Sequence, residues 1–478
     1  MLFVFLLGCQ QSELVVGDSE RQAEVSLSEP IVVQRPAPPQ FKQWNVIIVT
    51  ADTLRGDMLS SFGHPHLQTP NLDNLAKRSV RFSRAYTNIT TTVPAHASLF
   101  SSLYPMDHGA DSNRSFVSDE VQMLPEILHS AGWFTGAILN MPWLNPTVSN
   151  ITQGVEFVNP GNLERSADQT TALANDFLEE HSNTQKPFFL WVHYIDNHTP
   201  YKAPDEFSRM YYPSGKDPKA VNVKSLQRTW SAFPKTHQNN VHVDKWLSGI
   251  TDIEYVISQY EGSVSWLDQQ LKPLFQTMSQ KNLWDNTIFV FTSDHGESLG
   301  EHNLWFCHGG LFEPTVRIPL ILYYPGVPEN LAISDPVDLV DVKPTILSLL
   351  QLPIGQELRG DDLIALINGT QISNSEVLLQ HTGNSLRGLV TRHYKFITHL
   401  KNQDEYPFYP IEKGKIELYD LSSDPDELNN LAQDLPELVK QFHLRLEHYQ
   451  PRRNFQHRQE GFVDPKVQDR LRALGYME

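Results

Sequence analysis

Acidic and imidazole side chains gather at the end of the apolar run at residues 287–294. The stretch SDHGESLGEHNLWFCHGG places Asp294, His295, His302 and His308 within fifteen residues. Carboxylate oxygens combined with imidazole nitrogens suit a hard-to-borderline divalent cation such as Mn, Zn or Ca better than a soft one. The stretch therefore predicts a metal-binding region, in which His302 has the alternative role of capping the loop.

Two more acids follow apolar runs elsewhere in the chain. NVIIVTAD ends at Asp52 and FFLWVHYID ends at Asp196, with His198 two residues later. One acid at a strand end usually forms a turn or caps a helix. Three acids with neighbouring histidines instead indicate a ligand site beyond the carboxyl ends of parallel strands. On an extended chain Asp196 and His198 would share one side, whereas His193 fits a packed strand residue.

Thr92 offers a hydroxyl nucleophile at the start of a predicted helix. It lies in TTTVPAHASLF, where Pro94 suits the first helical turn and residues 97–103 continue the helix. Free backbone N–H groups and the positive dipole end would there stabilise an alkoxide and the anionic group that it attacks. The alternative from this segment alone is that Thr92 is only the N-cap.

These side chains need a scaffold that brings strand ends together. Buried apolar runs alternate with stretches of helical periodicity such as residues 255–278. This alternation predicts an α/β fold with a mostly parallel central sheet flanked by helices. Beyond residue 353 the pattern weakens and predicts a small C-terminal α+β subdomain. Its expected strands lie at 375–400 and 415–421, and its expected helices at 434–448 and 464–474.

Composition limits the class of partner. The chain has 478 residues, of which 40% are hydrophobic, so it can bury a large core and a smaller one. A formal net charge of -18 argues against nucleic acid and against direct binding to an anionic membrane surface. It does not exclude an anionic substrate, because a bound metal reverses the local potential. Two cysteines, Cys9 and Cys307, provide no disulfide framework.

The N-terminus resembles that of a bacterial lipoprotein. The apolar run MLFVFLL is followed by Gly8-Cys9, similar to a lipobox, and residues 10–44 are polar with a Pro-rich end, PAPPQ. We therefore expect a lipoprotein-type signal at 1–9, a flexible linker at 10–44 and an extracytoplasmic location, periplasmic or on the outer membrane of a bacterium. Membrane contact would then come only through the lipid anchor. A frayed hydrophobic terminus is the alternative.

An ordered series of segments resembles the sulfatase family of the alkaline phosphatase superfamily. The series includes NVIIVTADTLRGD, TPNLDNLA, TTVPAHASLFSSLYP, HYIDNHTPY, YEGSVSWLD, FTSDHGESLGEH, VRIPLIL, DLVDVKPTILSLL and LYDLSSDPDELNNLA, and it closes with RLRALGY. The resemblance implies an alkaline phosphatase-like catalytic domain at 45–355 and a C-terminal subdomain at 356–478. It also implies one divalent metal ion, Ca, Mn or Zn.

The resemblance to sulfatases implies a role for several individual residues of this sequence. His198 and His308 match positions that hold the substrate's anionic oxygens or protonate the leaving group, and the second is usually Lys in sulfatases. Arg55 and His96 are further candidates for binding those oxygens. The metal ligands and the nucleophile would be Asp52, Asp294, His295 and Thr92.

The sequence departs from the sulfatase pattern at the nucleophile. Sulfatases have Cys or Ser in Cys/Ser-x-Pro-x-Arg, oxidised to formylglycine, whereas this chain has Thr92-Val93-Pro94-Ala95-His96. Threonine cannot form that aldehyde, so we expect no formylglycine. Thr53 also replaces the second of two adjacent metal-binding acids. Both departures bring phosphoester chemistry into consideration beside sulfate.

The residues together predict a metal-dependent sulfatase-like hydrolase that cleaves a sulfate or phosphate ester through Thr92. The substrate would be a small anionic ester, or a sulfated or phosphorylated glycan or lipid, with its leaving group selected by an insertion at 203–250. A phosphodiester or phosphonate ester hydrolase, a phosphoglycerol-type transferase, and a catalytically inactive anion-binding lipoprotein are the alternatives. A second metal on Asp196, His198 and His308 is also open.

Overall fold

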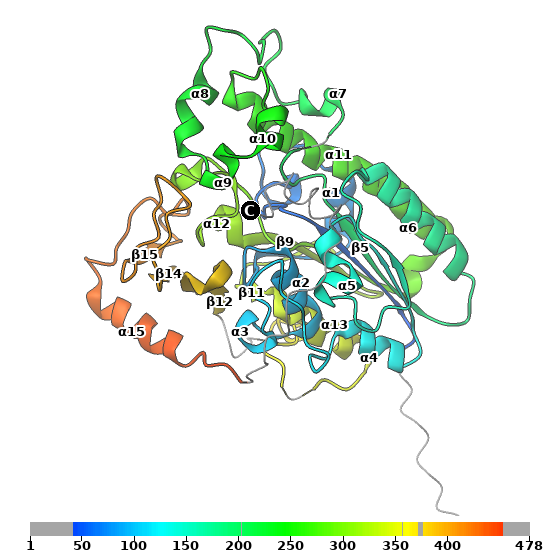
Figure 1. Ribbon diagram of the computed structural model, residues 1–478. Coiled ribbons are helices and arrows are strands. Elements are labelled where there is room, and N and C mark those ends of the chain that lie inside the picture. Colours follow the sequence, from blue (N-terminus) through cyan, green and yellow to red (C-terminus); the bar gives the residue numbers. More distant parts are fainter. Residues whose placement is uncertain (1–41, 202, 356, 371–375, 453–478) are drawn as a thin grey trace, which may run out of the picture. The chain divides into compact units, whose positions relative to one another are not determined.

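A mostly parallel β-sheet forms the centre of the structure (Figure 1). Its strand order is β10-β2-β9-β6-β1-β5-β3-β4, with β11 beside β2, and β1 runs parallel to both β5 and β6. Every residue of β1, NVIIVTA, is buried, as expected for a strand covered on both faces. The strands are β1 Asn45–Ala51, β2 Val80–Tyr86, β3 Phe134–Ile138, β4 Phe157–Asn159, β5 Phe188–Tyr194, β6 Thr287–Ser293, β9 Arg317–Tyr323, β10 Leu331–Ile333 and β11 Val337–Asp338.

The computed structural model describes residues 42–201, 203–355, 357–370 and 376–452. The predicted signal at 1–9, nearly all of the predicted linker and the helix predicted at 464–474 lie outside these residues. The predicted α/β class with a mostly parallel sheet is confirmed, with one exception in strand direction. β9 is antiparallel to both β6 and β2. Its apolar sequence predicts burial but carries no information about direction.

Helices cover both faces of the sheet (Figure 1). Along β1, Val46 and Ile48 pack into one core and Ile47 and Val49 into the other, because successive strand side chains point to opposite faces. The first core includes α2 Thr92–Ser101, α4 Leu124–Ser130 and α13 Val342–Leu350. The second includes α1 Pro70–Lys77, α6 Ala167–His181 and α11 Ile253–Gln280.

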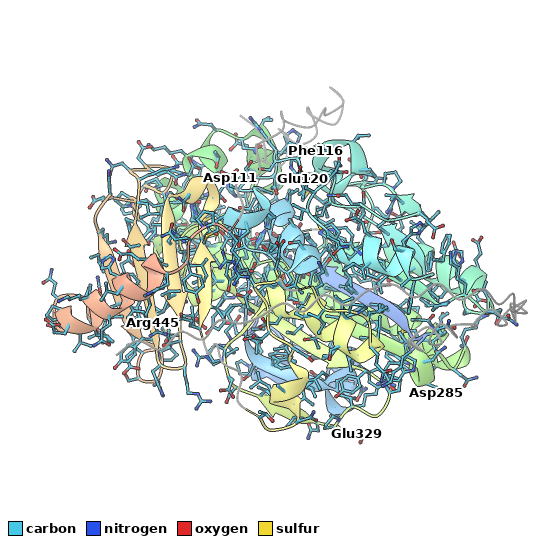
Figure 2. All side chains as sticks on the ribbon, turned by 90° about the horizontal axis from the view of Figure 1, so that it is seen from below. Asp111, Phe116, Glu120, Asp285, Glu329 and Arg445 are labelled. Carbon is cyan, nitrogen blue, oxygen red and sulfur yellow. The ribbon has the colours of Figure 1, made fainter. Side chains whose placement is uncertain are left out.

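The predicted C-terminal α+β subdomain is also present. Its antiparallel sheet has the order β12-β13-β14-β15, and α15 Pro436–Glu447 packs against it. Arg445 of α15, labelled in Figure 2, pairs with Glu376 immediately before β12. The strands are β12 Val377–Gln380, β13 Leu386–Val390, β14 Tyr394–His399 and β15 Ile416–Asp420.

Short elements complete the part of the chain that the structure describes. The insertion at 203–250 contains four short helices, and a small hairpin follows β6. None of the helices in the described ranges has the length and apolar composition required to cross a bilayer. The short elements are α3 Pro105–His108, α5 Pro146–Ser149, α7 Asp205–Ser208, α8 Ser225–Thr229, α9 Lys235–Gln238, α10 Val241–Trp246, α12 Glu313–Val316, α14 Ile364–Ile367, β7 Ser298–Leu299 and β8 Trp305–Cys307.

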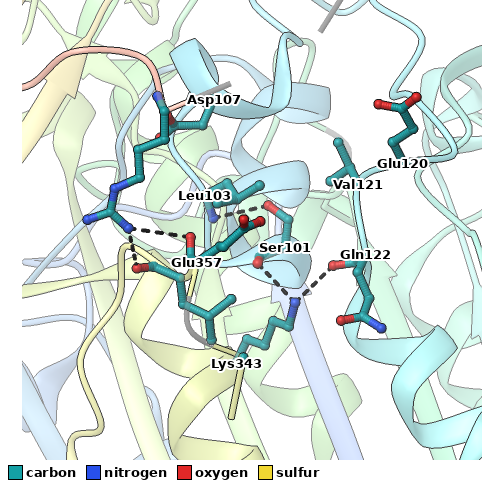
Figure 3. Close-up of a pocket in the computed structure, with 11 residues that line it drawn as sticks. Ser101, Leu103, Asp107, Glu120, Val121, Gln122, Lys343 and Glu357 are labelled. Atoms are coloured by element: carbon teal, nitrogen blue, oxygen red, sulfur yellow. Dashed lines mark hydrogen bonds between the residues drawn. The ribbon is translucent and has the colours of Figure 1, made fainter. Parts of the chain in front are cut away.

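A buried lysine holds the C-terminal end of α2. Lys343 of α13 is 2% exposed, and its Nζ donates to the carbonyl oxygens of Ser101 at 3.0 Å and of Gln122 at 2.8 Å (Figure 3). It lines a cavity of about 580 Å³, with Glu120 also on its wall. The last carbonyls of a helix lack helical partners and favour a cation. Lys343 therefore anchors the helix whose first residue is Thr92.

Replacing Lys343 with Met tests this anchor. The variant leaves the buried Ser101 carbonyl and the partly buried Gln122 carbonyl without this donor, at about 1–3 kcal/mol for each group that stays unmatched. We expect the free energy of unfolding, measured by urea denaturation, to fall by about 2–4 kcal/mol. The exposed Lys440 of α15 provides the control, and Lys440→Met should change stability by less than about 0.5 kcal/mol. Equal effects of the two variants would contradict the anchoring role.

Candidate active site

Two neighbouring parallel strands bring the predicted metal ligands together. Asp52 follows β1 and Asp294 follows β6, and Ala51 pairs in register with Ser293 just before them. His295 Nε2 lies 3.5 Å from Asp294 Oδ2 and 4.0 Å from Asp52 Oδ1, and the three side chains are buried. The ligand atoms of this trio all lie within 4.8 Å of one another. Two carboxylates and one imidazole are thus close enough to bind the same cation.

Local hydrogen bonds determine which atoms of Asp52, Asp294 and His295 are available to bind a cation. Asp294 Oδ1 accepts from the backbone N–H of Thr53 at 3.2 Å and of His295 at 2.9 Å, whereas Oδ2 receives no hydrogen bond from the described residues. Thr53 reaches this position with a φ of 58°. His295 Nδ1 lies 3.1 Å from the Gly296 carbonyl oxygen, which can only accept. Nδ1 therefore carries the proton, and Nε2 keeps its lone pair for a ligand.

The electrostatics of the trio fit a bound cation. Neither oxygen of Asp52 receives a hydrogen bond from the described residues. Burial, followed by the charges of Asp294 and Glu297, raises the pKa of Asp52 well above its ordinary value. Burial also acts to raise the pKa of Asp294, but His295 and other nearby histidines lower it overall. A divalent ion would offset the repulsion between the carboxylates, and the O, O, N donor set suits Mn, Zn or Ca.

Thr92 is the first residue of α2 and shares a cavity with His295. The N-cap is Thr91, so the alternative in which Thr92 serves only as the N-cap is wrong. The cavity has a volume of about 330 Å³. Thr92 is buried, and the next backbone N–H, that of Val93, donates to Asn113 Oδ1 at 2.9 Å. The helix N-terminus thus faces the same cavity as the candidate metal site.

The walls of this cavity come from three parts of the chain. The insertion predicted to cover the site does so, through residues 234–237. Residues of the C-terminal subdomain form another wall, which was not predicted, because the local sequence does not show against which part of the chain this subdomain packs. The lining residues are Thr90, Thr91, Thr92, Asn113, His198, Thr199, Pro234, Thr236, His237, His295, Cys307, His308, His381, Thr382, Gln403, Glu405 and Tyr406.

The insertion and the C-terminal subdomain are joined directly at this cavity. Thr236 of α9 donates to Glu405 Oε1 through its backbone N–H at 2.9 Å and through its hydroxyl at 2.6 Å. The backbone N–H of Lys235 donates to the Glu405 carbonyl at 3.0 Å, and the Lys235 ammonium pairs with Asp404. This clasp of α9 with residues 404–405 closes one side of the cavity.

The structure places both distal histidines near the metal trio. The His308 ring centroid lies 4.5 Å from that of His295 and 5.2 Å from that of His198. Burial, followed by His295 and His198, lowers the pKa of His308 well below its ordinary value, and burial lowers the pKa of His198 to about 3. Glu297 was missed, although it stands two residues after His295. Its buried carboxylate lies 3.5 Å from His308 Nδ1.

Arg55 and His96 do not line the cavity that contains Thr92. The Arg55 guanidinium pairs with Asp57 at 2.8 Å and with Glu301 at 2.7 Å, and it lines a separate cavity. His302 lines that same separate cavity, and its ring stacks on Phe312 with centroids 3.6 Å apart. The sequence motif shows that a charged side chain is near the strand end, but not which way it turns.

Both ring nitrogens of His96 form hydrogen bonds, one with the Thr92 backbone and the other with Thr50. Its Nδ1 donates to the Thr92 carbonyl at 2.8 Å, because that oxygen can only accept. With the proton on Nδ1, Nε2 accepts from the Thr50 hydroxyl at 3.1 Å, and the oxygen of that hydroxyl accepts from Trp191 Nε1 at 2.9 Å. His96 is fully buried. In this structure it links the first turn of α2 to the central sheet.

Asp196 and His198 do not share one side of an extended strand. β5 ends at Tyr194, and the N–H of His198 donates to the Ile195 carbonyl in a turn. Asp196 Oδ1 instead accepts from the N–H of Ala167, the first residue of α6, at 2.9 Å. Among the described residues, Asp196, His198 and His308 are not one of the trios whose ligand atoms all come within 4.8 Å.

Two family models match the chain. The sulfatase model matches residues 44–352, and the model of the N-sulphoglucosamine sulphohydrolase C-terminal region matches residues 300–452. The second match spans the subdomain that lines the cavity.

Individual proteins agree with these matches. The chain is 24% identical to choline-sulfatase from Rhizobium meliloti over 437 residues, covering 82% of each chain. The structure matches phosphonate monoester hydrolase of Agrobacterium radiobacter with a TM-score of 0.67 at 22% identity, covering 85% of this chain and 95% of that one. A structure solved in complex with its substrate D-glucosamine-2-N,6-O-disulfate matches with a TM-score of 0.64 at 20% identity, covering 85% and 97%.

The candidate metal trio predicts opposite effects of Asp52→Asn with and without metal. In chelator-treated protein, the variant should melt at a higher temperature than the wild type, because it removes one of two buried like charges. Added Mn²⁺ should stabilise the wild type by about 2.7 kcal/mol at a hundredfold excess over Kd. It should stabilise the variant much less.

Thermal melts with and without Mn²⁺ measure both effects. Asp285→Asn, at an exposed position labelled in Figure 2, is the control and should respond to Mn²⁺ as the wild type does. An Asp52→Asn variant that gains the full Mn²⁺ stabilisation would show that Asp52 is not a ligand.

Proposed function

The chain belongs to the sulfatase family, and we propose that it is a metal-dependent hydrolase of sulfuric or phosphoric esters with Thr92 as its nucleophile. One observation carries the proposal: Thr92 opens α2 in the same cavity as His295, whose Nε2 faces the buried carboxylates of Asp52 and Asp294. A hydroxyl nucleophile, a helix N-terminus and a cation site thus converge at one end of a cavity.

Thr92 would perform the chemistry without an aldehyde. Its Oγ, having lost its proton to water, forms the bond to sulfur or phosphorus as the ester oxygen leaves with a proton from His308. Water then hydrolyses the ester formed on Thr92 and restores the hydroxyl. A bound divalent ion supplies Lewis-acid chemistry here, since it lowers the pKa of a nearby hydroxyl and offsets charge on the substrate. The ligands that would hold it are Asp52, Asp294 and His295, and Thr92 Oγ is the proposed fourth ligand.

His198 and His308 would handle the substrate's oxygens. The Thr199 carbonyl lies 2.7 Å from His198 Nδ1 and holds a proton there, which fixes the orientation of the ring. An anionic group next to these rings favours their protonated forms, which opposes the effect of burial on their pKa. His308 would then donate a proton to the leaving oxygen, with Glu297 facing its Nδ1.

The charge of the cavity favours a singly charged ester group. Among the described residues that line it, none is Lys or Arg, and Glu405 is the acidic one. Burial lowers the pKa of His237 and of His381 to about 4, so these rings are neutral near pH 7. Sulfate esters, phosphodiesters and phosphonate monoesters each carry one negative charge, whereas a phosphate monoester carries close to two. The first three are therefore the proposed substrate classes.

The organic part of the substrate would contact the side of the cavity that the C-terminal subdomain forms. Gln403, Glu405 and Tyr406 offer an amide, a carboxylate and an aromatic ring on the C-terminal side of the cavity, which suits the hydroxyl groups of a sugar. The structural match to an enzyme bound to glucosamine disulfate supports a sulfated glycan as one candidate. The proposal also keeps the predicted lipid anchor and extracytoplasmic location.

Thr92 can be tested by paired substitutions. We expect Thr92→Ala to lower turnover at least about a thousandfold, because the nucleophile is lost. Thr92→Ser keeps the hydroxyl and should retain activity within about tenfold. Steady-state kinetics at saturating Mn²⁺, together with metal analysis and thermal melts, separate lost chemistry from lost folding. Unchanged activity of Thr92→Ala would refute the nucleophile. A folded, metal-loaded wild type that turns over no ester would instead favour the inactive anion-binding alternative.

A substrate panel tests the charge argument. Matched p-nitrophenyl sulfate, phosphate diester, phosphonate monoester and phosphate monoester share one leaving group. We expect kcat/KM for at least one singly charged ester to exceed that for the phosphate monoester by at least about tenfold, close to 1.4 kcal/mol of transition-state stabilisation. Preference for the phosphate monoester would overturn the argument, while the order of the other three decides between sulfate and phosphorus chemistry.

A further inference from the structure

His193 is a fully buried histidine whose ring nitrogens lack hydrogen-bond partners among the described residues. It lies on β5, paired in register with Thr50 of β1, directly beside the strand that ends at Asp52. His193 Nε2 is 3.5 Å from Asp52 Oδ2. The two oxygens of Asp52 therefore face different partners, since Oδ1 faces His295 Nε2 at 4.0 Å.

Burial of His193 and Asp52 costs free energy unless the two side chains form a hydrogen bond. A neutral imidazole carries one N–H, and a buried donor or acceptor without a partner costs about 1–3 kcal/mol. Asp52 Oδ2 has no other described donor. A shift of a few tenths of an ångström would bring the N–H of His193 into ordinary hydrogen-bond distance of that oxygen. A hydrogen bond between His193 and Asp52 would therefore satisfy one unpaired atom of each residue.

Neighbouring side chains limit the alternatives for His193. His193, His96 and Asp294 have ligand atoms within 4.8 Å of one another, which resembles a second metal site. Both nitrogens of His96 are already engaged, one by the Thr92 carbonyl and the other by Thr50. The rings of His96 and Trp191, with centroids 5.3 Å and 6.3 Å from that of His193, restrict its movement. A second ion here would lack its third ligand.

We propose that His193 is a positioning residue for the candidate metal site. Its Nε2–H donates to Asp52 Oδ2 and fixes the carboxylate so that Oδ1 is presented to the divalent ion with Asp294 Oδ2 and His295 Nε2. This inference rests on the metal site of the proposed function. Hydrogen bonds behind a ligand commonly change metal affinity ten- to a hundredfold, so the effect is measurable without turnover.

Mn²⁺ titration of the full chain by calorimetry tests the proposal. His193→Leu keeps a buried side chain of similar size but removes the donor, and we expect its Kd for Mn²⁺ to rise about ten- to a hundredfold with one ion still bound. His193→Gln restores an N–H donor near the position of Nε2 and should stay within about fivefold of the wild type. His108→Leu is the control for loss of a buried imidazole, because His108 is buried against Ser98 near the far end of α2 from Thr92 and belongs to none of the candidate ligand trios among the described residues. Its Kd should not change.

The outcomes separate this inference from the proposed function. Wild-type affinity in His193→Leu overturns the positioning role while leaving the metal site intact. Two ions in the wild type and one in both His193 variants would make His193 a ligand of a second ion and also overturn it. Absence of Mn²⁺ binding to the wild type, with thermal melts showing folded protein, overturns the metal-dependent function itself and this inference with it.

Discussion

The repulsion between two buried carboxylates is the constraint on which the rest of the site depends. Asp52 and Asp294 leave adjacent parallel strands at the same level, and both are cut off from water. The surrounding chain satisfies one oxygen of Asp294 with backbone N–H groups and leaves Asp294 Oδ2 without a donor among the described residues. A positive ion at that point would offset this repulsion, and the left-handed backbone of Thr53 is part of the arrangement that orients the Asp294 carboxylate.

The position of Thr92, the proposed nucleophile, depends on the contacts that hold α2 at both ends. At the first turn, His96 ties the Thr92 carbonyl to Thr50 of the central sheet. At the last turn, Lys343 binds the Ser101 carbonyl. Both contacts are buried, so they are less screened by solvent than surface contacts would be. Neither residue lines the cavity of Thr92, yet the direction of the helix, and with it the place of the hydroxyl, is set by them.

Backbone topology predicts that the strand-end acids Asp52 and Asp294 converge, and the family resemblance then singled them out, with His295, as candidate metal ligands. Parallel strands that each end in an acid bring those acids to one edge of the sheet, wherever the side chains turn. Arg55 shows the limit of that reasoning, since its guanidinium turns to Asp57 and Glu301 in another cavity. Glu405 shows a second limit. It reaches the site only through tertiary packing of the C-terminal subdomain, for which local periodicity carries no signal.

Regular elements form the side of the cavity near Thr92 and His295, whereas the insertion and loops form the opposite side. The end that would hold the ester group is built from strand ends and a helix N-terminus, and buried hydrogen bonds fix both. The end that would hold the organic group is built from the insertion and from loops of the C-terminal subdomain, and the contact of Thr236 with Glu405 joins them. Side chains at the loop end can change without moving the carboxylates, because no strand of the central sheet carries them. If the proposed function is correct, the residues that carry out the reaction and those that select the leaving group would be separate sets within this scaffold.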